Sequence, residues 1–132
     1  MKKPVAKSVL MSYYVMSNIT LYGIKQCDTV KKAQRWLTDH QLAFDFHDLR
    51  QDGINNTMLS DWLSHLDWTV LLNKRSTTWR QLASEQQQDL DKESAVALML
   101  AQPTLIKRPV MYYKDHYHVG FSASAYHQLF LS

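Results

Sequence analysis

The residue with the clearest capacity for chemistry is Cys27, the single cysteine among 132 residues. It lies between a short apolar segment, residues 19–23, and a stretch with helical periodicity. A thiol at the start of a helix is stabilised as the thiolate, the nucleophilic form, by the helix dipole and by unpaired N–H groups. Lys25 favours this charge state, whereas Asp28 opposes it. Alternatively, Cys27 could serve only as a small buried hydrophobic residue. Because it lies at the start of a predicted helix, we predict a reactive thiol instead.

A lone cysteine limits both the chemistry and the compartment. Val30 occupies the third position after Cys27, so the chain has no Cys-x-x-Cys pair and cannot resolve a mixed disulfide by itself. An external thiol would have to do so, because exchange needs an attacking thiolate. Without an intramolecular disulfide, the usual reason to export a small chain is missing. We therefore expect a cytoplasmic protein.

Arginines and histidines are the other candidates for site residues. Arg108 precedes Pro109, where an arginine is by default an exposed residue in extended backbone. If the peptide bond is cis, the guanidinium is directed at the helix start and could hold a carboxylate or oxyanion through two hydrogen bonds. His116 and His118 are two positions apart, but a metal site needs more ligands than these. We expect no metal and no bound cofactor.

The elements around Cys27 indicate a βαβ unit. Residues 19–23 alternate β-forming residues and end at a glycine, which predicts a strand. From Cys27 to His40, apolar residues recur at steps of three and four, which predicts a helix. Residues 44–47 alternate again after a short connection, so we expect a second strand and a partly parallel sheet.

The remaining chain predicts helices followed by a hairpin and a last helix. We expect a helix over residues 58–66 capped by Asn55 or Asn56, a loop with a short helical turn over residues 71–80, and a helix over residues 95–101. The last of these is apolar on nearly every side, which indicates burial on more than one face. A hairpin should follow over residues 110–119, turning at residues 114–116, and then a helix capped by Ser122 or Ser124.

Length and composition favour one soluble domain. The chain is 45% hydrophobic and 20% charged, and its net charge of +3 is spread without a basic run, so we expect neither disorder nor nucleic-acid binding. No segment has the length of a membrane span. We predict a single domain over residues 18–132, a monomer, preceded by an extension over residues 1–17 that imitates a signal peptide poorly. Translation could begin at Met11 or Met16.

The predicted element order corresponds to an α/β, thioredoxin-like fold with a helical insertion between its βαβ and ββα parts, although periodicity alone also allows other α/β and α+β folds. Three segments add a more specific signal: residues 21–29 (LYGIKQCDT), 71–75 (LLNKR) and 103–110 (PTLIKRPV). Together they resemble the family that contains the glutaredoxin-coupled arsenate reductases and the Spx and YffB-like proteins. Residues 120–122 (GFS) fit the YffB-like branch.

The resemblance implies site roles at matching positions. Cys27 corresponds to the nucleophile, Arg108 to an arginine beside a cis-proline, here Pro109, and Arg75 to a substrate-binding arginine of the YffB and Spx pattern. Thr29, in the cysteine motif, is implied as a further substrate-binding residue.

Two positions depart from the arsenate reductases. Asn73 stands where they carry an oxyanion-binding arginine, and their third arginine falls near Gly120. These departures weaken the case for arsenate as the substrate.

Two functions follow from these residues. The first is a thiol-dependent reductase in which the Cys27 thiolate attacks a disulfide or oxidised centre and the arginines hold an anionic partner. The resemblance names glutathione as co-substrate, with glutaredoxin as a further partner. The second is a non-catalytic, Spx-like regulator that binds RNA polymerase, although Val30 removes the Cys-x-x-Cys redox switch of such regulators.

Overall fold

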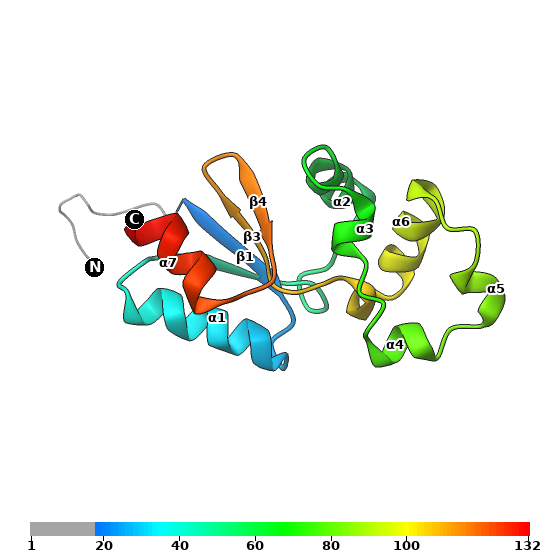
Figure 1. Ribbon diagram of the computed structural model, residues 1–132, viewed down its shortest axis with the longest axis horizontal. Coiled ribbons are helices and arrows are strands. Elements are labelled where there is room, and N and C mark those ends of the chain that lie inside the picture. Colours follow the sequence, from blue (N-terminus) through cyan, green and yellow to red (C-terminus); the bar gives the residue numbers. More distant parts are fainter. Residues whose placement is uncertain (1–17) are drawn as a thin grey trace.

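A four-stranded mixed sheet forms the centre of the computed structural model, which describes residues 18–132 (Figure 1). The strands stand in the order β2-β1-β3-β4. β1 pairs parallel with β2 and antiparallel with β3, and β3 pairs antiparallel with β4. Their bounds are Ile19–Gly23 for β1, Asp45–Asp48 for β2, Val110–Tyr113 for β3 and His116–Val119 for β4.

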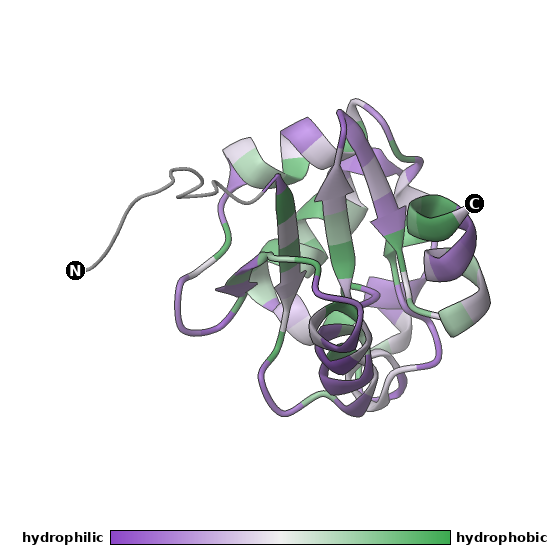
Figure 2. Cartoon of the chain, turned by 90° about the vertical axis from the view of Figure 1, so that its left-hand side faces the viewer, coloured by the Kyte–Doolittle hydropathy of each residue, from purple (hydrophilic) through white to green (hydrophobic). Residues whose placement is uncertain are grey.

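Two helices cover one face of this sheet. α1 (Asp28–Asp39) connects the parallel strands β1 and β2, and α7 (Ala123–Leu131) follows β4. Figure 2 shows hydrophobic segments along the central strands and polar segments on the outer surfaces of the surrounding helices. The core between the helices and the sheet is formed by buried residues of β1, α1, β3 and α7: Ile19, Leu21, Ala33, Leu37, Met111 and Tyr126.

A helical insertion, residues 56–105, separates the two halves of the sheet in sequence and packs beside it (Figure 1). It forms a second hydrophobic core with the loops at the end of β1 and the start of β3, around the fully buried side chains of Leu59, Trp62 and Met99. Its elements are α2 (Asn56–Leu63), α3 (Trp68–Leu71), α4 (Thr77–Arg80), α5 (Ser84–Gln87), α6 (Lys92–Ala101) and the 3₁₀ helix η1 (Pro103–Leu105).

This architecture confirms the thioredoxin-like fold with a helical insertion. The strands, α1 and α7 lie where the periodicity predicted them, with β2 beginning one residue later than expected. Asn55 caps α2 by accepting a hydrogen bond from the N–H of Met58 at 2.9 Å. Ser122 caps α7 by accepting one from the N–H of Ala125 at 3.1 Å. Both side chains satisfy an N–H group that has no partner inside its helix.

Three local predictions were wrong or incomplete. The hairpin turns at Lys114 and Asp115 alone, and His116 belongs to β4, because both turn residues adopt positive φ, 49° and 64°, as a two-residue turn requires. The four-residue helices α3 and α5 were not predicted, since one turn carries too little periodicity. α6 begins at Lys92, three residues before the predicted start, because Asp91 caps it there. Its burial on more than one face is confirmed, since Val96, Leu98 and Leu100 pack against the second core besides the buried Ala95 and Met99.

The predicted extension over residues 1–17 lies outside the described residues. Within residues 18–132, no helix is long and apolar enough to cross a membrane.

Candidate functional site at the start of helix α1

Cys27 is the N-cap residue of α1, with φ −73° and ψ 125°. Its N–H donates to the carbonyl of Ile24 at 3.0 Å, and its own carbonyl accepts the first helical hydrogen bond from the N–H of Lys31, also at 3.0 Å. The side chain is partly exposed and contacts the second core. The structure therefore confirms that the thiol lies at a helix N-terminus, reached from solvent on one side and supported by apolar side chains on the other.

The first turn of α1 is open to an acceptor. N–H groups in the first turn have no partner within a helix, and Cys27 does not accept a hydrogen bond from them through its side chain. They are directed at the same region as the thiol, where a thiolate or a bound anion gains from their partial positive charge. Thr29, the second residue of α1, has an exposed side chain.

Close contact between β1 and α1 fixes where this helix begins. Gly23, at the end of β1, faces Val30, which is completely buried in the first turns of α1. A Cβ atom at position 23 would stand 2.7 Å from Val30 Cγ2 and 2.9 Å from Val30 Cγ1. The strand and the helix approach this closely only because residue 23 has no side chain.

Asp48 ties the loop before Cys27 to the end of β2. Its carboxylate accepts hydrogen bonds from the N–H groups of Lys25 at 3.1 Å, Arg50 at 2.8 Å and Gln51 at 2.9 Å. Burial disfavours the charged carboxylate, but these hydrogen bonds and the Lys25 charge outweigh it and lower the pKa of Asp48. This residue was missed at the sequence level. The available signal was an Asp followed closely by Gly53, which is typical of a turn.

We expect Asp48→Asn to destabilise the protein by about 1 to 2 kcal/mol at neutral pH, because the three N–H groups lose a charged acceptor. A lowered folded-state pKa means that the carboxylate stabilises the fold at pH values above the unfolded pKa, near 3.9. That advantage is lost as the pH falls through the still lower folded-state value. Urea unfolding of wild type and Asp48→Asn from neutral to acidic pH measures this difference in the free energy of unfolding.

Glu85→Gln, at an exposed carboxylate of α5, is the matched control and should change neither the stability nor its pH dependence appreciably. A constant difference between wild type and Asp48→Asn across the acidic range would contradict the role assigned to the Asp48 charge.

Two segments that carry the candidate arginines are paired with each other. Leu72 and Ile106 form an antiparallel bridge. The N–H of Asn73 donates to the carbonyl of Leu105 at 2.7 Å, and the N–H of Lys107 donates to the carbonyl of Leu71 at 2.8 Å. This pairing brings the loop of residues 71–75 beside the segment of residues 103–110, although about thirty positions separate them in sequence.

Arg75 is exposed on the rim of a cavity of about 460 Å³. Asn73 is folded back into this loop, because its side-chain oxygen accepts from the N–H of Arg75 at 3.0 Å. Asn73 therefore shapes the loop at the position where arsenate reductases carry an arginine. Three basic residues contribute to the lining of this cavity, which consists of Thr69, Leu72, Asn73, Lys74, Arg75 and Lys107.

Arg108 is partly buried, and its peptide bond to the buried Pro109 is cis, as the motif predicts. Its Nη1 donates to the carbonyls of Thr104 at 3.0 Å and Ile106 at 2.9 Å. One nitrogen of the guanidinium thus stabilises the backbone of residues 104–106. Nε is buried and has no hydrogen-bond partner among residues 18–132, so it remains unsatisfied within the chain itself.

The second core is where these segments converge. Cys27 and Ile24 from the cysteine loop contact the same cluster as Leu72 from the Arg75 loop and Ile106 from the Arg108 segment. The cysteine loop and both arginine-bearing segments thus border one hydrophobic core, but neither Cys27 nor Arg108 lines the cavity beside Arg75. Gly120 lies near the sequence position at which the arsenate reductases carry their third arginine. It adopts a φ of 85°, which residues with a side chain rarely adopt. The backbone at position 120 disfavours an arginine there.

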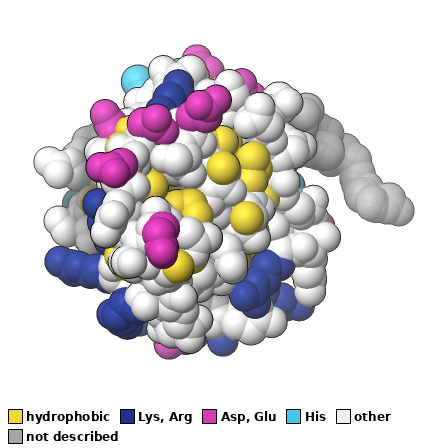
Figure 3. Space-filling view, turned by 90° about the vertical axis from the view of Figure 1, so that its right-hand side faces the viewer, with side chains coloured by type: hydrophobic (Ala, Val, Ile, Leu, Met, Phe, Trp, Pro, Cys, Tyr) yellow, Lys and Arg dark blue, Asp and Glu magenta, His cyan; other side chains and the backbone are white. Residues whose placement is uncertain are grey.

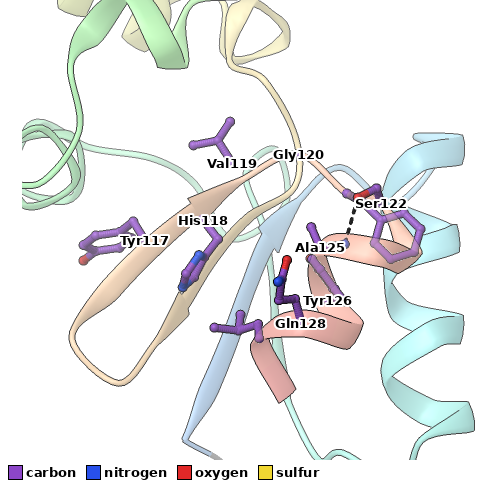
Figure 4. A pocket seen from close by; sticks show the side chains of 10 residues that line it. Tyr117, His118, Val119, Gly120, Ser122, Ala125, Tyr126 and Gln128 are labelled. Atoms are coloured by element: carbon purple, nitrogen blue, oxygen red, sulfur yellow. Dashed lines mark hydrogen bonds between the residues drawn. The ribbon is translucent and has the colours of Figure 1, made fainter. Parts of the chain in front are cut away.

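A larger groove lies elsewhere, between β4 and α7, with a volume of about 870 Å³ (Figure 4). Figure 4 shows the side chains of His118 and Gln128 beside it. Burial and the neighbouring His116 lower the pKa of His118, which favours the neutral imidazole. Within residues 18–132, no group of three His, Cys, Asp or Glu residues is arranged to hold a metal ion. This groove contains none of the predicted site residues.

Comparisons with known proteins agree with the fold. A sequence model of the ArsC family matches residues 22–129. The chain is similar to the solved structure of a YFFB protein, with 46% identity and a TM-score of 0.79, over 83% of this chain and 96% of that one. It is also similar to an arsenate reductase (ArsC) related protein from Brucella melitensis, with 42% identity and a TM-score of 0.73, over 89% and 97% of the two chains.

A more distant similarity connects the chain to a transcriptional regulator. The global transcriptional regulator Spx of Streptococcus agalactiae is 28% identical over 79% of this chain and 77% of the regulator.

Proposed function

Because this chain belongs to the ArsC family, we propose that it is a cytoplasmic thiol oxidoreductase whose nucleophile is Cys27 and whose co-substrate is glutathione. The observation that carries the proposal is the position of Cys27 as the N-cap of α1, partly exposed beside an open first helical turn. A thiolate at this position is stabilised by the helix and remains accessible to a second sulfur atom.

The reaction consists of two thiol–disulfide exchanges. The Cys27 thiolate attacks a disulfide, forms a mixed disulfide and releases the other sulfur as a thiolate. The buried Val30 occupies the position of a resolving cysteine, and the chain has no cysteine besides Cys27. A thiolate of glutathione or glutaredoxin must therefore attack the mixed disulfide. That second step restores the Cys27 thiolate and releases a new disulfide.

The arginines are assigned to the anionic partner. Glutathione carries two carboxylates, which basic side chains can bind. Lys74 and Lys107 line the same cavity as Arg75. Arg108 retains a guanidinium arm that its backbone contacts do not use. We propose a disulfide as the oxidised substrate in preference to arsenate, because Asn73 stands where arsenate reductases carry an arginine and their third arginine, which falls near Gly120, is absent.

Replacing Arg75 tests this assignment. We expect Arg75→Gln to slow the reaction of Cys27 with oxidised glutathione about five- to thirtyfold, equivalent to roughly 1 to 2 kcal/mol of a charge-assisted contact. The rate with a neutral disulfide, 2-hydroxyethyl disulfide, should change less than twofold. Stopped-flow or quenched intact-mass measurements give both rates.

Arg35→Gln makes the same change of charge at an exposed position of α1 and serves as the matched control. Equal slowing by the two variants would mean that only the net charge of the protein affects the rate. No slowing by Arg75→Gln would mean that Arg75 does not bind the disulfide.

The similarity to Spx supports a second candidate, a regulator that binds RNA polymerase without catalysis. The two functions separate in one experiment. Recovery of polymerase subunits on the immobilised wild-type protein and equally on Cys27→Ser, together with an unreactive thiol, would favour the regulator.

A further inference from the structure

We propose that the groove between β4 and α7 binds an extended peptide segment with uncharged, apolar side chains, which adds to the sheet as a further strand beside β4. Three observations carry the proposal: the outward backbone groups of β4, the groove beside them and the lack of charged side chains around both. This groove contains none of the residues assigned to the thiol chemistry, so failure of one proposal leaves the other intact.

β4 lies at an edge of the sheet, with β3 as its only neighbouring strand within residues 18–132. In an antiparallel pair, successive residues direct their N–H and C=O groups alternately toward the neighbouring strand and away from it. The N–H of Gly120 donates to the carbonyl of Pro109 at 2.8 Å. Gly120 and His118 thus bond toward β3, and Tyr117 and Val119 direct their backbone groups outward. A row of such outward groups is a template for another strand.

The two edges of the sheet differ in their protection. Edge strands in native proteins are usually blunted by charged side chains, proline or a bulge. β2, at the opposite edge, begins with Asp45 and ends with Asp48. β4 contains no Asp, Glu, Lys, Arg or Pro, and its register with β3 is continuous, without a bulge. The edge at β4 therefore lacks the features that keep other strands away.

The groove provides room for side chains of the added strand. His118 lies on the α7 face of the sheet, because its partner Met111 packs in the core beneath α7. Figure 4 shows His118 on β4 and Gln128 on α7 at opposite sides of the groove, which Ala125 and Leu129 also line. Successive side chains of a strand point to opposite faces of a sheet, so alternate side chains of the added strand enter this groove.

Pairing with an edge strand, combined with a groove that receives alternate side chains, is the mode in which proteins bind peptides by strand addition. The groove has a volume of about 870 Å³, which is enough for several side chains. The backbone groups of β4 thus specify an extended chain, and the groove specifies its side chains.

The surroundings of the groove select uncharged side chains. Every Asp, Glu, Lys and Arg of the chain lies before position 116, and none of them lines the groove. A charged side chain in the groove would lose water without meeting an opposite charge. Figure 3 shows the contrasting end of the molecule, formed by the insertion, where acidic and basic side chains surround exposed hydrophobic ones.

An NMR titration of the backbone amides tests where the strand adds. The probe is the peptide Val-Thr-Val-Thr-Val, acetylated and amidated so that its ends carry no charge. We expect saturable shifts that are largest for the N–H signals of Tyr117 and Val119 and smaller for those of His116 and His118, because only the first two N–H groups point outward. The absence of saturable shifts in β4 would overturn the proposal.

Two modified probes test the chemistry of the occupant. Methylation of every inner amide nitrogen keeps the side chains and removes the donors that a strand needs, so the dissociation constant should rise about tenfold or more. Replacement of the three valines by lysines keeps the backbone and should weaken binding at least as much, because the charges have no partner in the groove. Unchanged binding of either probe would contradict strand addition or the selection of uncharged side chains.

Ala125→Trp tests the groove by filling it. The variant should raise the dissociation constant of the unmodified probe about tenfold or more, whereas Ala123→Trp, at an exposed alanine of the same helix outside the groove, should leave it unchanged. Circular dichroism should show both variants folded, since both alanines are exposed. Equal effects of the two variants would overturn the proposal. So would β4 signals that shift with protein concentration without peptide, because a second copy would then be the occupant.

Discussion

Oxidised glutathione is expected to add one glutathionyl group to the wild-type chain and none to Cys27→Ser, with complete loss of any disulfide reductase activity in the variant. The chain has no second thiol that could replace Cys27 or attack its mixed disulfide. The adduct should therefore persist until free glutathione or a glutaredoxin is added, because exchange requires an attacking thiolate. Intact-mass spectrometry measures both its formation and its removal.

Rate separates an evolved site from an accidental thiol. The folded protein should form the adduct about tenfold faster or more than the same chain in urea, because the helix terminus stabilises the thiolate and the basic residues hold the anionic disulfide. A cysteine peptide of the sequence 24–30 controls for the effect of urea on the reagent. If the folded chain reacts no faster than the unfolded one, Cys27 is a bystander and the polymerase-binding regulator becomes the better hypothesis.

The second large effect is expected at Gly23. Gly23→Ala places a methyl group 2.7 Å from Val30 Cγ2, and Val30 is β-branched and held in a helix, so it cannot rotate away easily. We expect a loss of about 1 to 3 kcal/mol in the free energy of unfolding, as overpacking of a core gives. The start of α1 should also move, which should slow the reaction of Cys27 with disulfides.

A double-mutant cycle identifies the cause. Val30→Ala alone removes buried methyl groups and should destabilise the protein by about 2 kcal/mol. Combined with Gly23→Ala it also removes the clash, so the double variant should be more stable than the sum of the two losses predicts. Urea unfolding of the four proteins measures the coupling. Strict additivity would mean that the strand and the helix adjust without strain.

Local signals explain why much of the fold was predictable. The cysteine loop, the caps at Asn55 and Ser122, and the strand periodicities depend on residues within a few positions of one another. The position of Cys27 as an N-cap follows from the same local pattern. For the site, the motifs predicted the cis bond before Pro109 as well.

What could not be predicted depends on contacts between distant residues. The bridge between Leu72 and Ile106 and the hydrogen bond from the Lys25 N–H to Asp48 join segments whose sequences give no sign of the other partner. Arg108 contributes one arm to backbone carbonyls, a use that no motif reveals.

The separation of the sheet into two halves has a consequence for the order in which the protein folds. β1 and β2 are joined through α1, and β3 and β4 through a two-residue turn, so each half closes a short loop. The central pairing joins Leu21 to Met111, 90 positions later in the chain. Because closure entropy grows only logarithmically with loop length, the helical insertion costs little stability, yet such distant pairing slows folding. The halves can therefore form early, and the site, which needs both, is completed at the last and slowest step.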